Sequence, residues 1–150
     1  MAGSSAAGED MMELCSGAHI KYQVVYHLQW APKYRYKIFK KESHKKDYKM
    51  VLEEAAERHE IKIMELAIMP DHVHAVVRCP ASMSVSKALF YLKGASSHDF
   101  FQLHPNMRKC YRRGHLLSAG KFCRTVGDVD LETTKEYVRE QAVQTTLTSF

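Results

Sequence analysis

Two histidines stand two residues apart in the stretch MPDHVHAVV, residues 69–77. The residues around them are mostly apolar and β-branched, which predicts a strand. Side chains two positions apart on a strand share a face, with Cα atoms roughly 6.5 Å apart, and two imidazole nitrogens about 2.1 Å from a metal ion can converge across that gap. His72 and His74 are therefore candidate metal ligands. An isolated pair of this kind is more often two polar positions on the solvated face of a half-buried sheet.

A tyrosine and a glutamine lie four residues apart near the C-terminus. Tyr137 and Gln141 fall in LETTKEYVREQA, residues 131–142, whose pattern predicts a helix. Positions i and i+4 lie one above the other on a helix, so the two side chains share a face. A neighbouring stripe can pack on a sheet and consists of Leu131, Thr134, Val138 and Ala142. A core tyrosine on an amphipathic helix is the ordinary alternative.

The elements that must position these residues follow from hydrophobic periodicity and turn residues. Strands are predicted at residues 19–30, ended by Pro32, and at 61–69, 72–79 and about 121–126. Helices are predicted at residues 45–59, at 84–98 with Ser84 as the N-cap, and at 131–142 with Asp130 as the N-cap. Pro70 and Asp71 form the turn of an antiparallel hairpin between the second and third strands.

The resulting order, β-α-β-β-α-β-α, indicates an α/β protein of the α+β kind. It predicts one antiparallel sheet with helices on one face, in the ferredoxin-like or RRM-like manner, plus a C-terminal helix that carries the tyrosine. With 150 residues and 45% hydrophobic content the chain can bury one core, so we expect one domain, residues 19–142. Residues 1–18 are expected to be a disordered leader and residues 143–150 a flexible tail.

The charge of the chain favours an anionic partner. There are 22 Lys and Arg against 17 Asp and Glu, a formal charge of +5, and nucleic acid is the leading candidate. Basic residues alternate with Tyr34 and Tyr36 in one segment, which could combine phosphate contacts with base stacking. The candidate DNA-binding residues are Lys33, Arg35, Lys37, Lys93, Arg112 and Arg113. A solvated basic loop is the alternative for each of them.

The four cysteines and the hydropathy of the chain bear on its compartment. Cys15, Cys79, Cys110 and Cys123 lie far apart and form no C-x-x-C pair, so we expect reduced thiols in a cytoplasmic protein. The first residues lack the basic and apolar regions of a secretory signal. No apolar run approaches the roughly 18 to 20 residues that span a bilayer, so no membrane partner is expected.

Five stretches of the chain, taken in order, resemble a known family. They are HLQWAPKYRYK, MPDHVH, YLKGASS, GHL and RTVGDVDLETTKEYVREQ. Together they resemble the single-tyrosine HUH transposases of small bacterial and archaeal insertion sequences, the TnpA type of IS200-like transposase, over residues 19–142. The stretch LLSAGKF departs from the family, because it lacks the aromatic and proline residues that many members carry after GHL.

The resemblance implies cleavage and rejoining of single-stranded transposon ends by an obligate homodimer. By motif match, His72 and His74 bind a divalent metal, Tyr137 attacks the scissile phosphate and Gln141 is a third ligand. Asp71 is the alternative to Gln141 as a ligand. The resemblance also implies that hairpins in the DNA ends are bound by shape, and that the two active sites form in trans, with the tyrosine helix of one subunit facing the histidines of the other.

The chemistry expected of this site explains why a metal is needed. A free tyrosine titrates near 10, so about 0.1% is phenolate at pH 7, a deficit of roughly 4 kcal/mol for a nucleophile. A metal ion can offset this deficit by drawing charge from the phosphate and stabilising the leaving 3′-oxygen. Two imidazoles and an amide oxygen leave positions for phosphate and water, which suits Mg²⁺ or Mn²⁺ better than a closed zinc site. The product is a 5′-phosphotyrosine that a 3′-hydroxyl can resolve.

Other functions compete with this interpretation. A related HUH nuclease, either a domesticated repeat-associated transposase or a replication initiator, would use the same residues. A catalytically silent RRM-like nucleic-acid binder and a structural metal protein belong to different classes. A pure binder has no need of His72, His74, Tyr137 and Gln141 together, which argues against the silent protein.

Overall fold

The computed structural model describes residues 15–16, 19–20 and 23–148. Its strands are β1 (Cys15–Ser16), β2 (His19–Ile20), β3 (Gln23–Pro32), β4 (Lys62–Ile68), β5 (Val73–Pro80) and β6 (Leu117–Val126). Its helices are η1 (Lys33–Arg35), α2 (Glu42–Arg58), α3 (Val85–Leu103), α4 (Pro105–Arg108), η2 (Asp128–Asp130) and α5 (Leu131–Thr148). Among the described residues, the two short strands β1 and β2 pair only with each other. Most of the expected leader, residues 1–14 and 17–18, lies outside the described residues.

Four antiparallel strands form the main sheet, in the order β4-β5-β3-β6. The hairpin expected around Pro70 and Asp71 is confirmed, and the backbone N–H of Met69 donates to the carbonyl of His72 at 2.8 Å. In the register of the sheet, His74 of β5 lies opposite Gln29 of β3 on one side and Ala67 of β4 on the other.

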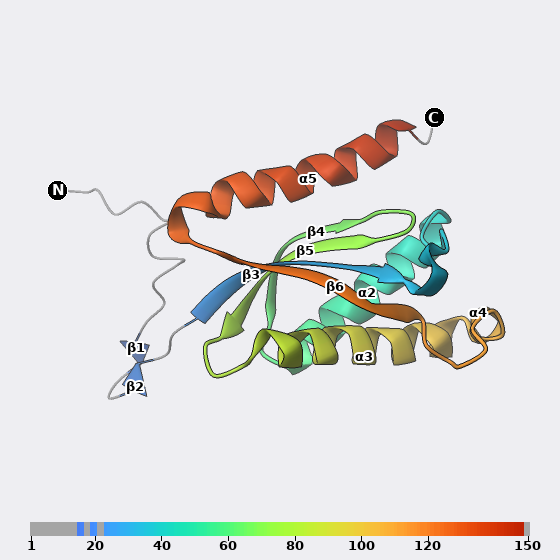
Figure 1. The fold of residues 1–150 in the computed structure, drawn as a ribbon, viewed down its shortest axis with the longest axis horizontal. Helices are drawn as coiled ribbons and strands as arrows, with labels where there is room; N and C mark the ends of the chain where they lie inside the picture. Colours follow the sequence, from blue (N-terminus) through green and yellow to red (C-terminus); the bar gives the residue numbers. More distant parts are fainter. Residues whose placement is uncertain (1–14, 17–18, 21–22, 149–150) are drawn as a thin grey trace.

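One face of the sheet is covered by α2 and α3, which lie below it in Figure 1. The stripe expected on the first helix is buried as predicted, and consists of Tyr48, Val51, Leu52, Ala55 and Ala56. The Trp30 indole N–H of β3 donates to the Tyr48 hydroxyl at 2.9 Å, and that hydroxyl also bonds Ser96 of α3 at 3.2 Å. This buried bond pair ties two helices to the central strand.

The opposite face of the sheet carries α5, which crosses above it in Figure 1. A second, smaller cluster of buried residues holds the helix, and consists of Val25, Ala67, Val76, Val126, Leu131 and Val138. The predicted fold class is confirmed: an α+β sheet with two long helices on one face and the tyrosine-bearing helix on the other. The sheet therefore separates a large core from the layer that holds Tyr137.

Several element ends differ from the prediction. Strand β3 continues through Pro32, which pairs with Leu117 of β6 after an irregularity in the ladder, so β6 also begins earlier than the expected residue 121. Helix α3 runs to Leu103 and not to residue 98, because Phe100 and Phe101 extend its buried stripe.

The C-terminal helix differs from the prediction at its C-terminal end. It begins at Leu131, as predicted, directly after η2, but it runs to Thr148 and not to residue 142, so residues 143–148 are helical where a flexible tail was expected. The Thr145 hydroxyl contacts the Met69 sulfur at 3.0 Å, which fastens this last part of α5 to the end of β4. Within the described ranges, no helix is both long and apolar enough to cross a membrane.

Candidate active site

The two histidines lie where the β4–β5 turn enters β5. His74 is the second residue of β5 and is 3% exposed, whereas His72 directly precedes the strand and is half-buried. Their ring centroids are 5.0 Å apart and the ring planes are inclined at 76°. The next residues along the strand, Val73 and Ala75, are fully buried on the opposite face, as the alternation predicted. The strand thus presents two imidazoles to the α5 side of the sheet.

A carboxylate holds the first of these histidines. The Nδ1–H of His72 donates to Oδ1 of Asp71 at 2.8 Å, and Oδ2 of Asp71 accepts from the Arg35 guanidinium at 3.2 Å. Burial raises the pKa of Asp71, but the hydrogen bonds from His72 and Arg35 and their charges outweigh it, and the net pKa is below the usual value. Both oxygens of Asp71 are engaged by side chains, which suits an orienting neighbour better than a metal ligand.

His74 contacts a third histidine, His27, which the sequence did not single out. Nε2 of His27 on β3 lies 3.2 Å from Nδ1 of His74, with the rings stacked at 29° and 5.4 Å between centroids. Burial, together with the nearby His72 and His27, lowers the pKa of His74 to about 4. Burial and the neighbouring Arg124 lower the pKa of His27. Both rings are therefore neutral at neutral pH, and a neutral imidazole is the form that binds metals.

The tyrosine of α5 reaches the same place. The Tyr137 ring is 5.9 Å from that of His74 and 6.1 Å from that of His27, both in edge-on geometry. Thr134 and Val138, on the adjoining stripe of the helix, are buried against the sheet and fix the rotation of α5. Tyr137 is 46% exposed, although these two residues on the adjoining stripe are buried.

Gln141 lies one turn further along α5. One turn before Gln141, the Tyr137 ring contacts that of His74, and one turn after it, Thr145 contacts Met69. Gln141 therefore lies on the part of α5 that passes over residues 69–74. Among the described residues, its side chain forms no hydrogen bond with either histidine. The structure thus brings His72, His74 and Tyr137 together, and leaves Gln141 on the same helix beside them.

The histidine pair fits a shared metal ion. Each Nδ1 is engaged, and in the part of the chain that the structure describes no hydrogen bond reaches either Nε2. Two imidazoles bound to one ion at about 2.1 Å have ring centroids roughly 4.6–5.3 Å apart for bond angles near 90–110°. The observed 5.0 Å lies in this range. No three His, Cys, Asp or Glu side chains cluster as a metal site within the described residues, so a closed site of such ligands is not present there.

Comparison with known proteins decides the family. The sequence profile of the family described as "Transposase IS200 like" matches residues 20–141. The chain belongs to the IS200-like transposase family. It is 30% identical over 124 residues to the transposase of insertion sequence element IS200 from Salmonella typhimurium, covering 83% of this chain and 80% of that protein. It is 26% identical over 130 residues to the ISDra2 transposase TnpA from Deinococcus radiodurans, covering 87% of this chain and 92% of that protein.

Solved structures agree with this family assignment. A crystal structure of a Deinococcus radiodurans protein assigned as a transposase superposes with a TM-score of 0.67 at 26% identity, covering 85% of this chain and 98% of that one. The REP-associated tyrosine transposase, solved with a REP hairpin, has a TM-score of 0.59 at 10% identity, covering 87% and 74%. The latter likeness concerns the fold alone.

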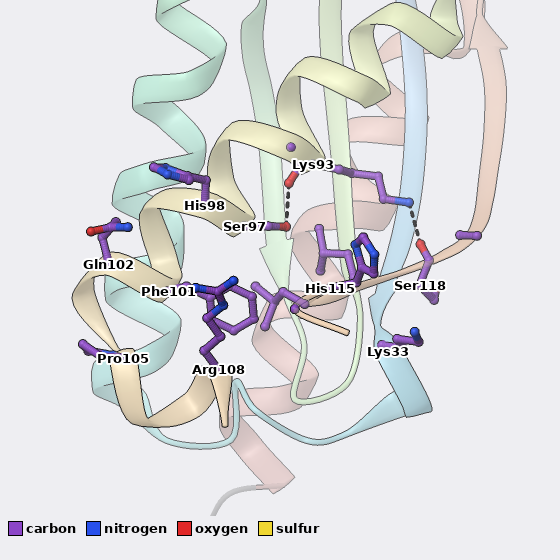
Figure 2. Close-up of a pocket in the computed structure, with 15 residues that line it drawn as sticks. Lys33, Lys93, Ser97, His98, Phe101, Gln102, Pro105, Arg108, His115 and Ser118 are labelled. Carbon is purple, nitrogen blue, oxygen red and sulfur yellow. Dashed lines mark hydrogen bonds between the residues drawn. The ribbon is translucent and has the colours of Figure 1, made fainter. Parts of the chain in front are cut away.

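Two of the predicted DNA-binding residues of this IS200-like transposase share a pocket. Lys33 and Lys93 line an open pocket of about 1010 Å³ between α3 and the start of β6. Figure 2 shows that Arg108 and His115, which the sequence did not single out, also line this pocket. The Lys93 ammonium donates to the carbonyl of Ser118 at 2.7 Å, so α3 is joined to β6 across the pocket.

The other four candidates lie around an aromatic cluster. Tyr34 and Tyr36 are exposed, and their rings lie 6.4 and 5.7 Å from that of the buried Tyr111. Arg35 extends from the same segment to Asp71, and Lys37 is exposed. Arg112 and Arg113 are exposed beside Tyr111 and line a second, shallower pocket. The basic segment is thus connected through Arg35 to the turn that holds His72.

Proposed function

We propose that this chain cleaves and rejoins single-stranded DNA at transposon ends, with Tyr137 as the nucleophile. The observation that carries the proposal is the approach of the Tyr137 ring to within 5.9 Å of the His74 ring, beside His72. Phosphoryl transfer to a tyrosine needs a nucleophile next to groups that stabilise charge on the phosphate. Tyr137 on α5 would supply the nucleophile, and the histidines at the start of β5 would supply those groups. Membership of the IS200-like transposase family supports the same reaction.

A divalent ion, Mg²⁺ or Mn²⁺, is the cofactor that we propose for this site. His72 and His74 would hold it through Nε2, and the amide oxygen of Gln141 would be the third ligand. Mixed nitrogen and oxygen donors with open positions suit these ions. When bound, the ion would supply Lewis-acid stabilisation of the charge on the scissile phosphate.

The covalent steps use the chain's own hydroxyl. The Tyr137 oxygen forms a bond to phosphorus, the bond from phosphorus to the 3′-oxygen breaks, and the departing oxygen takes up a proton. The phenolic proton passes to water, to which the half-exposed side chain is open. In the 5′-phosphotyrosine the ester bond to tyrosine replaces the broken ester bond to the 3′-oxygen, so a 3′-hydroxyl that attacks the phosphorus releases the tyrosine and restores a DNA strand without any other energy source.

The basic residues are proposed to hold the DNA backbone. Lys33 and Lys93 share one pocket, and the exposed Tyr34 and Tyr36 offer ring faces for unpaired bases. The remaining proposed phosphate contacts are Arg35, Lys37, Arg112 and Arg113. That a protein of this fold was solved with a REP hairpin supports a hairpin as the form of DNA bound.

We further infer that the active species is a homodimer with sites formed in trans. In the single chain, Tyr137 lies beside its own His74, and α5 is attached through Gly127 and η2. Leu131 and Val138 of α5 would make the same apolar contacts with the identical sheet of a second copy. Two copies could therefore exchange their α5 helices without loss of these contacts.

Detection of a covalent adduct tests the reaction. Single-stranded DNA from the flanking ends is incubated with the protein and Mg²⁺, and the products are separated on a denaturing gel. We expect a protein–DNA adduct that is absent with Tyr137→Phe or with a chelator, and present with the matched control Tyr91→Phe on α3. DNA binding without any adduct from the unmodified protein would instead indicate a silent nucleic-acid binder.

A further inference from the structure

His27 is a buried histidine to which the proposed reaction gives no role. It lies in the middle of β3, is 6% exposed, and faces α5, opposite Val76 of β5 and Arg124 of β6. Its Nε2 is 3.2 Å from Nδ1 of His74. A buried imidazole inside a sheet loses its hydrogen bonds to water, so the bond to His74 governs where its proton lies.

The hydrogen bond between two neutral imidazoles has a direction that matters. Each neutral ring carries one N–H and one lone pair. If His27 donates from Nε2, the proton of His74 must be on its own Nε2, and that nitrogen cannot bind a metal. If His74 donates from Nδ1, its Nε2 keeps the lone pair. Only the second arrangement is compatible with His74 as a ligand.

We propose that His27 is a positioning residue that accepts the Nδ1 proton of His74 and so presents Nε2 of His74 to the metal. This inference rests on the proposed function. It requires the proton of His27 to be on its Nδ1. The rings of Phe122 and Tyr137 lie edge-on to His27, with centroids at 5.8 and 6.1 Å, and limit its rotation.

The role parallels that of Asp71 but is more restrictive. The Asp71 carboxylate can only accept a hydrogen bond, so the proton of His72 is on Nδ1 and its lone pair is on Nε2. An imidazole can donate or accept, so His27 must be held in one tautomer. The two ligands are thus oriented by partners of different chemistry, one on the turn and one on the neighbouring strand.

A matched pair of substitutions separates this role from simple packing. His27→Gln keeps an acceptor on a side chain of similar length, whereas His27→Met has similar length and no comparable acceptor. Mn²⁺ binding to the metal-free protein is measured by the loss of the free-ion signal in electron paramagnetic resonance, with His74→Ala as the reference. We expect His27→Met to weaken binding about tenfold or more and His27→Gln to stay within a few-fold of the unmodified protein, as for other groups that orient metal ligands.

The unmodified protein gives an independent test. Imidazole ¹⁵N chemical shifts of the metal-free protein report which nitrogen of His74 carries the proton, and we expect Nδ1. A proton on Nε2, equal weakening by Gln and Met, or undiminished binding by His27→Met would each overturn the role of His27. If His74→Ala itself leaves Mn²⁺ binding unchanged, the proposed metal site fails, which is a different result.

Discussion

Burial makes the two histidines of the site chemically unequal. His74 is 3% exposed and stacks on another imidazole, whereas the side chain of His72 is 19% exposed and bonds a carboxylate. A carboxylate partner makes an imidazole a stronger donor to a metal, and a buried position keeps an imidazole neutral. As proposed metal ligands, the pair therefore combines a well-oriented imidazole at the rim with an imidazole enclosed by the sheet.

Removal of either histidine should separate cleavage from binding. We expect His72→Ala and His74→Ala to abolish adduct formation while hairpin affinity changes little, because the proposed phosphate contacts lie on other residues. Adduct yield and DNA affinity are measured on the same preparations. Normal cleavage by both variants at limiting metal concentration would be incompatible with the proposed site.

The buried Tyr48 hydroxyl should make stability depend on alkaline pH. Burial raises the pKa of Tyr48 to about 12, although its bonds to Ser96 and Trp30 lower it, so the folded state favours the neutral phenol relative to the unfolded value near 10. The contribution is complete below pH 10 and is lost as pH rises toward 12, with a slope of about 1.4 kcal/mol per pH unit.

Substitution of this tyrosine tests that expectation. Tyr48→Phe leaves the Trp30 N–H without its acceptor and should lower the free energy of unfolding at pH 7 by about 1–3 kcal/mol. The same variant should show a shallower loss of stability between pH 10 and 12 in denaturant titrations. An unchanged alkaline slope would show that other groups cause it.

Sequence patterns identified the residues of the proposed site, but not the partners that hold them. Local spacing can be read from the sequence alone, both for His72 and His74 on a strand and for Tyr137 and Gln141 on a helix. His27 was missed because its place beside His74, 47 positions away in sequence, depends on the register between β3 and β5. Arg108 was missed for a similar reason, since α4 places it in the same pocket as Lys33 only in the folded chain.

At the scale of elements, periodicity predicted the type and order of the main strands and helices but not their ends. The stripe of α2 was correct because all five positions are buried, and four of them, Tyr48, Val51, Leu52 and Ala56, belong to the large core. The later ends of α3 and α5 depend on tertiary contacts, those of Phe100 with the core and of Thr145 with Met69, which no local pattern contains. Periodicity was therefore sufficient to place the helix that carries Tyr137 and insufficient to show how it is anchored.

The anchoring of α5 can be tested with one valine pair. Val138 is fully buried in the small cluster beneath α5, whereas Val143 on the same helix is 55% exposed. Val138→Ala should lower the free energy of unfolding by about 1–3 kcal/mol and reduce the rate of adduct formation, because Tyr137 loses its fixed position. Val143→Ala is the matched control and should change neither by much. Equal effects of the two variants would argue against anchoring by the buried cluster.

At the scale of the whole molecule, the formal charge of +5 should appear as salt dependence. An increase from about 50 to about 200 mM salt should weaken DNA binding tenfold or more, as expected if about three or more phosphates are neutralised. Affinity is measured by fluorescence anisotropy at several salt concentrations. The double variant Lys33→Gln with Lys93→Gln should give a shallower slope, and a flat response of the unmodified protein would exclude the basic surface as the main binder.

Subunit mixing distinguishes trans from cis assembly. Consider a heterodimer of one His72→Ala subunit with one Tyr137→Phe subunit. Trans assembly leaves one of its two active sites intact, whereas cis assembly leaves one defect in each active site. We expect two inactive parents to give an adduct after exchange, carried by the His72→Ala subunit because it alone retains Tyr137. A size tag on one subunit identifies the carrier on a gel. No adduct after independently confirmed exchange would defeat trans assembly and leave the chemistry standing.

The small cluster beneath α5 has a consequence for the behaviour of the free protein. If the helix detaches while the larger core stays intact, Val25, Val76 and Val126 become an uncovered apolar strip on the sheet. That strip can be covered again by the chain's own helix or by the helix of another copy. The first event is independent of concentration and the second is not, so mass action governs the choice: dilution returns α5 to its own sheet, and crowding of copies on one DNA favours its transfer.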